Sequence, residues 1–176
     1  PGAFPLSLNS WVEFNPTTPM LYDVLAIQNM YGANTTWHTG DDTYEFVQGI
    51  AYFQTIWDAG GIDTIEWSAS SQGALIDLRA GQFSEIGNPL KYWDADSLHS
   101  WTDKRTVAIA FGVTIENAIG GTGDDVIVGN DAINRLDGHG GADTITGGKG
   151  ADVLVGGAGN DTFVCDSGTD LVTDLG

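Results

Sequence analysis

The chain has a single cysteine, Cys165, among its 176 residues, so an internal disulfide is excluded. Basic residues are also scarce: 6 Lys and Arg stand against 24 Asp and Glu, which gives a formal net charge of −18. Such a chain repels nucleic acid and anionic membrane surfaces, so neither is expected as a partner. No apolar run approaches the ~18 residues of a membrane-spanning helix. Bound metal cations would relieve the self-repulsion and replace the missing disulfides as a stabiliser.

Catalytic signatures are missing as well. The sequence contains neither the H-E-x-x-H pattern of a zinc protease nor the G-x-S-x-G pattern of a serine hydrolase. Its three histidines, His38, His99 and His139, lack the spacing of a zinc-binding pair on one helix. The first residues have neither the basic start nor the apolar stretch of a signal peptide. We therefore expect a non-enzymatic piece of a longer protein.

Glycine, in contrast, is abundant, with 25 residues against a usual frequency of ~7%. From Gly120 onward the glycines belong to six consecutive blocks of nine residues that start at 120, 129, 138, 147, 156 and 165. An acid or amide occupies position six of every block: Asp125, Asn134, Asp143, Asp152, Asp161 and Asp170. A large apolar residue occupies position eight: Ile127, Leu136, Ile145, Leu154, Phe163 and Val172. Such a fixed period predicts a solenoid.

Each block divides into a six-residue turn and a three-residue strand. Glycine allows the positive φ angles and close backbone approach that such a turn needs. One short strand buries too little to fold alone, but stacked copies bury a continuous column of position-eight side chains. We therefore predict an all-β fold, a parallel β-roll joined to an irregular β-sandwich region, with one N-terminal α-helix. Successive turns alternate sides, so the turns at 120, 138 and 156 form one ridge (the 120 ridge) and those at 129, 147 and 165 the other (the 129 ridge).

Stacking brings the position-six carboxylates of each ridge close together, where they would repel one another. A calcium ion reverses this effect, because it accepts 6–8 oxygens from carboxylates and carbonyls. Residues 120–176 contain no Glu and ten Asp, as expected if the short Asp side chain reaches back into its own turn. Zinc would require recurring His or Cys. The predicted calcium ligands in the roll are Gly121, Gly123, Asp125, Asn130, Ala132, Asn134, Gly138, Gly140, Gly141, Asp143, Gly147, Gly148, Gly150, Asp152, Gly156, Ala158, Gly159, Asp161, Gly168 and Asp170.

The block at 129 departs most from the pattern, with Asn134 in place of Asp, so its site is expected to bind weakly or to depend on Asp131. Upstream, a related half-motif occurs at 40–46 and again at 61–67. These two turns could share another calcium ion with Asp58, or they could simply cap a hairpin. Extending the nine-residue frame one block upstream suggests a further half-site at Thr114 and Glu116.

The rest of the chain is organised around shorter patterns. A helix is expected from the Thr18 cap to Gly32, and alternating polar and apolar residues predict strands at 43–46, 64–67, 75–78 and 107–111. Residues 86–105 read as a long loop that contains Trp93 and Trp101. The predicted organisation is one compact unit with three parts: an irregular segment plus helix (1–32), a β-rich region with the upstream calcium site (33–118), and the roll (119–176).

Several stretches resemble known proteins. The blocks of nine are similar to those of the repeat-in-toxin family. Residues 17–34, 57–61 and 112–121 resemble the C-terminal region of serralysin-type secreted zinc proteases. The resemblance implies an upstream calcium site formed by carbonyls of His38 and Gly40 together with Asp42, Asp58, Gly60 or Gly61, and Asp63, and further ligands at Thr114 and Glu116. The family usually has Arg where His38 stands, and the segment 86–105 looks longer than is usual.

The resemblance implies a secreted, extracellular protein exported by a type I secretion apparatus. The leading interpretation is a non-catalytic module that folds on binding about 4–6 calcium ions and no zinc, and that supports an upstream catalytic domain, a serralysin-like metalloprotease. The alternative is a polysaccharide- or surface-binding module of another exported enzyme, with Trp93 and Trp101 as its ligand-binding residues.

Overall fold

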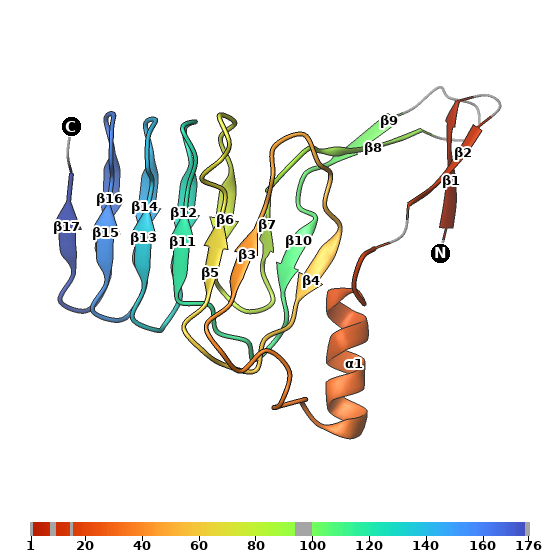
Figure 1. Ribbon diagram of the computed structural model, residues 1–176, viewed down its shortest axis with the longest axis horizontal. Coiled ribbons are helices and arrows are strands. Elements are labelled where there is room, and N and C mark those ends of the chain that lie inside the picture. Colours follow the sequence, from red (N-terminus) through yellow and green to blue (C-terminus); the bar gives the residue numbers. More distant parts are fainter. Residues whose placement is uncertain (1, 8–9, 15, 94–99, 175–176) are drawn as a thin grey trace.

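The computed structural model describes residues 2–7, 10–14, 16–93 and 100–174, and almost all of its regular structure is β. Seven strands of three residues each recur every nine residues and stack side by side along the molecule (Figure 1). They are β11 (Asn117–Ile119), β12 (Val126–Val128), β13 (Arg135–Asp137), β14 (Thr144–Thr146), β15 (Val153–Val155), β16 (Thr162–Val164) and β17 (Leu171–Thr173).

Successive strands alternate between two parallel sheets, as the nine-residue period predicts. One sheet has the order β17-β15-β13-β11-β5-β3 and the other the order β16-β14-β12-β6. Position-eight residues pair in register: Ile127 with Ile145, and Leu136 with Leu154. All four of these side chains are fully buried. The predicted parallel β-roll, with its column of position-eight side chains, is therefore confirmed.

The sheets continue upstream of the repeats. Strands β3 (Thr43–Glu45), β5 (Thr64–Glu66) and β6 (Leu75–Asp77) extend the same two sheets, and their pairings within these sheets are parallel. The half-motifs at 40–46 and 61–67 are thus two turns of the roll rather than the caps of a hairpin. A third sheet, β4-β10-β7, lies beside them and consists of β4 (Gln54–Ile56), β7 (Phe83–Ser84) and β10 (Val107–Ile109).

Helix α1 (Leu21–Tyr31) lies against the N-terminal end of this β structure (Figure 1). Its predicted stop at Gly32 is confirmed, with φ at 84°. Its start is not: Met20 rather than Thr18 caps the helix. The hydroxyl of Thr18 instead accepts the backbone N–H of Thr55 at 2.6 Å, which ties the chain to β4 before the helix begins.

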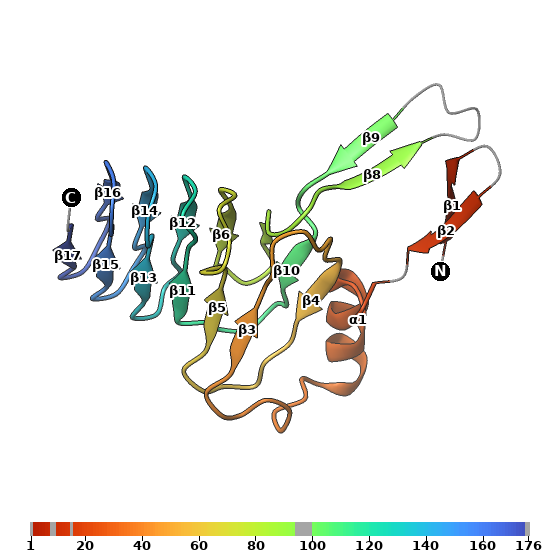
Figure 2. The same ribbon diagram turned by 45° about the horizontal axis from the view of Figure 1, so that its top comes forward.

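Two predicted irregular segments are hairpins. Strands β1 (Gly2–Ser7) and β2 (Ser10–Phe14) pair antiparallel, and so do β8 (Leu90–Trp93) and β9 (Ser100–Asp103). Figure 2 shows both hairpins projecting from the same end of the molecule. Pro5 lies within the first hairpin, because a two-stranded ribbon tolerates proline on its free edges. In the second segment, the separation between β8 and β9 conceals their pairing in the sequence.

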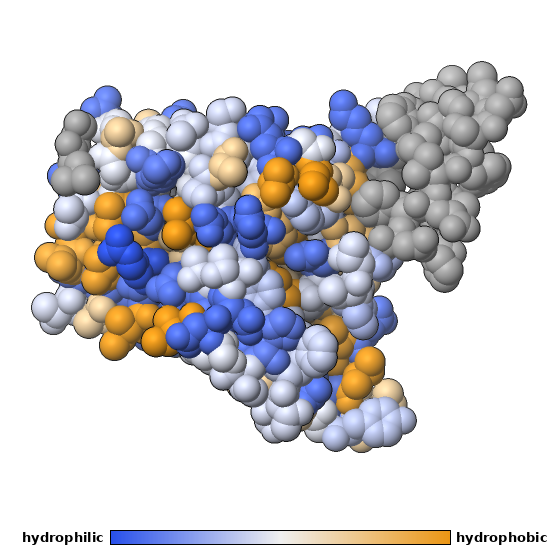
Figure 3. All heavy atoms as spheres, in the orientation of Figure 1, coloured by the Kyte–Doolittle hydropathy of each residue, from blue (hydrophilic) through white to orange (hydrophobic). Residues whose placement is uncertain are grey.

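At the C-terminal end of the roll apolar side chains become exposed, including Val172, the last residue of the position-eight column. Val164, Leu171 and Val172 are all at least 40% exposed, and apolar side chains gather at this end in Figure 3. Among the described residues, the one helix is too short and too polar to cross a membrane.

Candidate metal sites

The position-six carboxylates form a regular ladder along the 120 ridge. The backbone N–H of Ala74 donates to Asp125 Oδ1 at 2.6 Å, that of Asp125 to Asp143 Oδ1 at 2.7 Å, and that of Asp143 to Asp161 Oδ1 at 2.9 Å. Each carboxylate therefore uses one oxygen to bind the previous turn on its own side of the roll. These bonds fix the orientation of the second oxygen, Oδ2.

The 129 ridge has the same ladder, and it continues into the upstream turns. Asp152 and Asp170 accept backbone N–H groups of Asn134 and Asp152 at 2.9 and 3.1 Å. Further upstream, Glu116 Oε2 accepts the N–H of Asp63 and Asp63 Oδ1 accepts that of Asp42, both at 2.8 Å. Asp63 and Glu116 thus occupy position six of two additional turns, which the nine-residue frame predicted for Glu116, and the longer Glu side chain still reaches its neighbour.

The second oxygens of this ladder are largely unpartnered. The Oδ2 atoms of Asp63, Asp143, Asp152 and Asp161 are buried and have no hydrogen-bond partner. An unsatisfied buried carboxylate oxygen is costly unless a cation or donor compensates it. Asp125 differs, because its Oδ2 accepts the N–H of Gly121 at 2.7 Å.

Glycine lines the space beside these oxygens. A Cβ atom at Gly138, Gly147 or Gly156 would lie only 2.2–2.6 Å from Oδ2 of the acid in the same turn. Backbone carbonyls face the same turns. The carbonyls of Gly123 and Ala132 would lie 2.5 Å from a Cβ at Gly141 and Gly150, respectively. Each turn is therefore a cradle of carboxylate and carbonyl oxygens without side chains to fill it, which is the donor set that calcium prefers.

The other glycines and alanines predicted as ligands also lie in turns where backbone groups approach one another closely. At position four, φ is 121–137° in Gly141, Gly150, Gly159 and Gly168, which a side chain would strain. Carbonyls of Gly141 and Gly150 approach Gly159 and Gly168 so closely that no Cβ would fit. The Asn130 carbonyl faces Gly148, and Ala158 accepts the N–H of Gly141 at 2.9 Å, while Gly140 donates to the Gly121 carbonyl at 3.1 Å.

The turn at 129–134 is closed differently. Asn130 Nδ2 donates to the carbonyls of Ile115 and Leu78 at 2.7 and 3.1 Å, and Asn134 Nδ2 donates to that of Glu116 at 2.9 Å. The side-chain oxygen of Asn130 accepts the N–H of Ala132. Amide groups thus already satisfy carbonyls that would otherwise face a cation. Asp131 is exposed and pairs with Lys149 at 2.6 Å, so it does not face this turn.

The upstream cluster brings together predicted residues from two segments of the chain, 38–42 and 58–61. His38 Nδ1 lies 2.9 Å from Asp42 Oδ2, and donor atoms of His38, Asp42 and the buried Asp58 all lie within 4.8 Å of one another. The Asp58 carboxylate accepts the Tyr44 hydroxyl at 2.6 Å and the Gly60 N–H at 2.8 Å. The Gly40 carbonyl faces Gly61, where a Cβ would lie 2.1 Å from it.

Tyr44 was not predicted as part of the site. The only sequence signal is its place in β3, where it alternates with Thr43 and Glu45. Burial, followed by its hydrogen bond to Asp58, raises the pKa of Tyr44 well above its usual range, so the hydroxyl stays a donor. Of the other predicted residues, Thr114 is exposed beside Glu116. The side chains of Trp93 and Trp101 lie outside the part of the chain that the structure describes.

Burial also raises the pKa of the ladder carboxyls. The pKa of Asp63 is raised to about 6 and that of Asp143 to about 7; burial is the largest cause, a backbone N–H opposes it, and neighbouring carboxylates add to it. Burial raises the pKa values of Asp125 and Asp152 in the same direction. Without a cation, these carboxylates are therefore held in the folded state at a cost.

The raised pKa values of these carboxyls predict how the free energy of unfolding depends on pH when calcium is absent. Since the folded-state pKa values lie above the unfolded value, the folded state binds protons more tightly. The free energy of unfolding should therefore fall as the pH rises from about 4 through 7. The folded fraction in calcium-free buffer, followed by circular dichroism between pH 5 and 7.5, measures this effect, and it should be larger at pH 5. Stability that increased with pH would contradict the assignment of unpaired buried carboxyls.

The pattern of the chain is shared with known proteins. A family model described as the C-terminal region of peptidase M10 serralysin matches residues 26–175. The chain is similar to serralysin from Proteus mirabilis (46% identical over 67% of this chain and 24% of that protein) and to serralysin C from Dickeya chrysanthemi (45% identical over 62% and 22%). It is also 39% identical to metallopeptidase AprA from Pseudomonas marginalis over 70% of this chain and 25% of that protein. The chain thus spans about a quarter of the length of these relatives.

Proposed function

Because the chain belongs to the peptidase M10 serralysin C-terminal family, we propose that it is a non-catalytic module that folds by binding calcium in the turns of its roll. The observation that carries the proposal is the repeated buried Oδ2 atom without a partner in Asp63, Asp143, Asp152 and Asp161. These atoms recur at equivalent positions on both ridges and face glycine turns. If these acids served only to hold adjacent turns together, the hydrogen-bonded Oδ1 atom of each carboxylate would be enough.

In the proposed sites, each position-six carboxylate contributes Oδ2, and backbone carbonyls of its own and adjacent turns contribute the rest. The 120 ridge would use Asp125, Asp143 and Asp161, and the 129 ridge Asp152 and Asp170. Upstream, the proposed ligands are Asp42, Asp58 and Asp63 with the carbonyls of His38, Gly40 and Gly60 or Gly61. Thr114 and Glu116 are proposed for the half-site before the first block. The number of ions is proposed to be about 4–6.

The residues of the roll explain why folding would depend on the ion. Bound calcium supplies positive charge that offsets the repulsion of stacked carboxylates. The ladder hydrogen bonds hold Oδ1, so that Oδ2 is oriented before any ligand arrives. Each site that is saturated a hundredfold above its dissociation constant adds about 2.7 kcal/mol to stability. Six divalent ions, with 12 positive charges, would reduce the formal charge from −18 to about −6.

Family membership also places the protein outside the cell. We propose that the module is attached to an upstream catalytic domain, a serralysin-like metalloprotease, and that it supports type I secretion of that protein. Low cytosolic calcium would keep the acidic turns open during export, and millimolar calcium outside would allow them to close. Polysaccharide binding through Trp93 and Trp101 remains an alternative that no contact in the described residues favours.

Replacing Asp143 by Ala should weaken calcium binding far more than replacing Asp124 by Ala. The two are well matched, because each accepts a backbone N–H from the adjacent turn on its ridge, at 2.7 Å for Asp143 and 2.8 Å for Asp124. Only Asp143 has a buried, unpartnered second oxygen. We expect D143A to lose at least about tenfold in affinity at one site, ~1.4 kcal/mol, in calorimetric titration, and D124A to lose little. Equal losses would show that the proposed register of ligands is wrong.

A further inference from the structure

The upstream cluster contains one group that calcium does not use, the imidazole of His38. Calcium takes oxygen ligands, whereas imidazole nitrogen suits zinc and other first-row transition ions. His38 Nδ1 lies 2.9 Å from Asp42 Oδ2, and the side chain is 36% exposed. Together with the buried Asp58, these groups form a mixed nitrogen and oxygen set from two separate chain segments.

We infer that His38, Asp42 and Asp58 form a second class of metal site, which binds a divalent transition ion such as Zn²⁺ through the imidazole nitrogen and two carboxylates. A tetrahedral ion with bonds of about 2.0–2.2 Å places its ligand atoms about 3.3–3.6 Å apart. The donor atoms here lie between 2.9 Å and 4.8 Å from one another, so small side-chain rotations bring them to that separation. One ligand position remains on the exposed side of His38.

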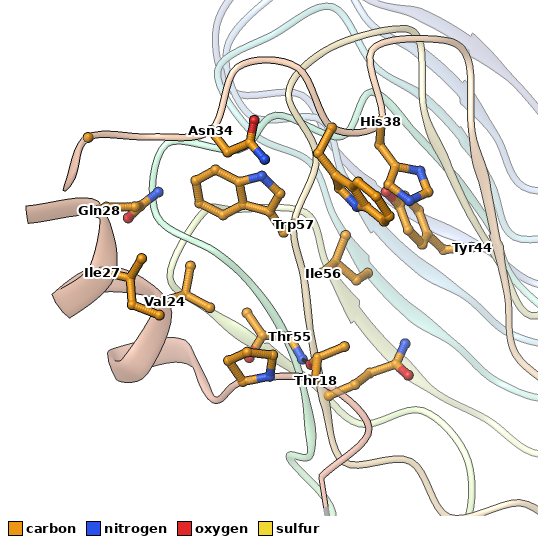
Figure 4. A pocket seen from close by; sticks show the side chains of 14 residues that line it. Thr18, Val24, Ile27, Gln28, Asn34, His38, Tyr44, Thr55, Ile56 and Trp57 are labelled. Carbon is orange, nitrogen blue, oxygen red and sulfur yellow. Dashed lines mark hydrogen bonds between the residues drawn. The ribbon is translucent and has the colours of Figure 1, made fainter.

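Neighbouring groups orient these ligands. The Tyr44 hydroxyl and the Gly60 N–H hold the two oxygens of Asp58, in the way that outer hydrogen bonds usually orient metal-binding carboxylates. Trp37 contacts the imidazole edge-on, with ring centroids 4.9 Å apart, and the Tyr44 ring lies 6.2 Å away. Figure 4 shows His38 beside Tyr44 at one side of an apolar pocket of about 470 Å³ that Trp57 and Val24 also line. The aromatic side chains restrict the rotation of the imidazole.

The proposed transition-metal site rests on the same Asp42 and Asp58 as the proposed upstream calcium site. Zinc binding there does not require the roll to bind calcium. At this cluster a transition ion gains a nitrogen ligand and calcium gains nothing from the imidazole. Zinc should therefore displace calcium here and leave the turns of the roll unchanged. The two proposals are thus separable by experiment.

The test is titration of the full chain with Zn²⁺, and with Co²⁺ as a spectroscopic probe, in millimolar calcium. His38 and His139 both have positive φ angles, 50° and 70°, which Asn tolerates, so H38N and H139N are matched variants. We expect one strong zinc equivalent and a Co²⁺ absorption band in the wild type and in H139N, and at least a tenfold weaker affinity in H38N. The calcium-dependent circular dichroism should be unchanged in H139N.

A readout that needs no variant is the nitrogen NMR spectrum of the imidazole rings, in which zinc should shift His38 Nδ1 and leave His139 unchanged. Zinc binding of equal strength in H38N, or an unshifted His38 resonance at saturating zinc, would overturn the inference. Failure of calcium to induce folding would instead refute the proposed function, whatever the result with zinc.

Discussion

Removing calcium should unfold the roll. In millimolar calcium at pH 7.5 the chain is expected to show a β-type circular dichroism spectrum, and excess chelator should convert most of it to a coil spectrum. The reason is that Asp143, Asp152 and Asp161 each keep a buried oxygen without a partner, and the metal-free fold offers no group that compensates it. Loss of several sites at ~2.7 kcal/mol each is comparable with the 5–15 kcal/mol stability of an ordinary domain.

Magnesium at the same concentration is the control, because it demands tight octahedral geometry and dehydrates reluctantly. It should not restore the β spectrum after chelation. Calcium added in excess of the chelator should restore it. A spectrum that stays β-type throughout chelation would mean that calcium is not needed for the fold.

The second large effect concerns export. Replacing Asp125, Asp143, Asp152 and Asp161 together by Ala, in the complete protein with its own secretion signal, should greatly reduce the yield of folded protein outside the cell. These four residues include the whole position-six set of the 120 ridge. Without them the core residues Ile127, Ile145 and Leu154 would stay exposed after export, and the product should be digested by added protease.

The matched control is the replacement of Asp124 and Asp131 by Ala, which removes exposed turn carboxylates and leaves the position-six ladder intact. Secreted yield and protease resistance, measured with and without millimolar calcium in the medium, separate the two variants. A normal yield of protease-resistant protein from the fourfold variant would show that calcium has no part in export.

The nine-residue period was enough to predict the roll, because it fixes both the turn chemistry and the one buried side chain in each strand. The same frame correctly placed Glu116 at position six, one block before the repeats begin. It also suggested that the half-motifs at 40–46 and 61–67 belong together, and they are adjacent turns of the same sheet.

Other features depend on contacts that no local pattern reveals. The start of α1 is displaced because Thr18 binds the backbone of Thr55, 37 residues away. The side-chain amides of Asn130 and Asn134 form a hydrogen-bond network, in which Asn130 reaches the carbonyls of Leu78 and Ile115. From the sequence, Asn134 suggested only a calcium ligand weaker than Asp. The β8–β9 hairpin was missed because each strand has only four residues and no turn signature marks the six residues between them.

The His38 cluster shows the same limit. The sequence gives a histidine four residues before Asp42, which in isolation resembles a surface ion pair. The family resemblance had grouped His38, through its carbonyl, with Asp42 and Asp58; only the fold shows that the imidazole itself converges on the two carboxylates. Long-range topology, rather than composition, therefore decides which acids can act together.

The most direct test of the calcium assignment is diffraction from crystals grown in millimolar calcium, with anomalous data collected at long wavelength. Calcium at the proposed sites should give anomalous peaks about 2.3–2.6 Å from Oδ2 of Asp143, Asp152 and Asp161, repeated along both ridges. No peak is expected in the turn at 129–134, which side-chain amides close. An absence of peaks beside these three carboxylates, with their Oδ2 atoms hydrogen-bonded to water or protein instead, would contradict the calcium assignment.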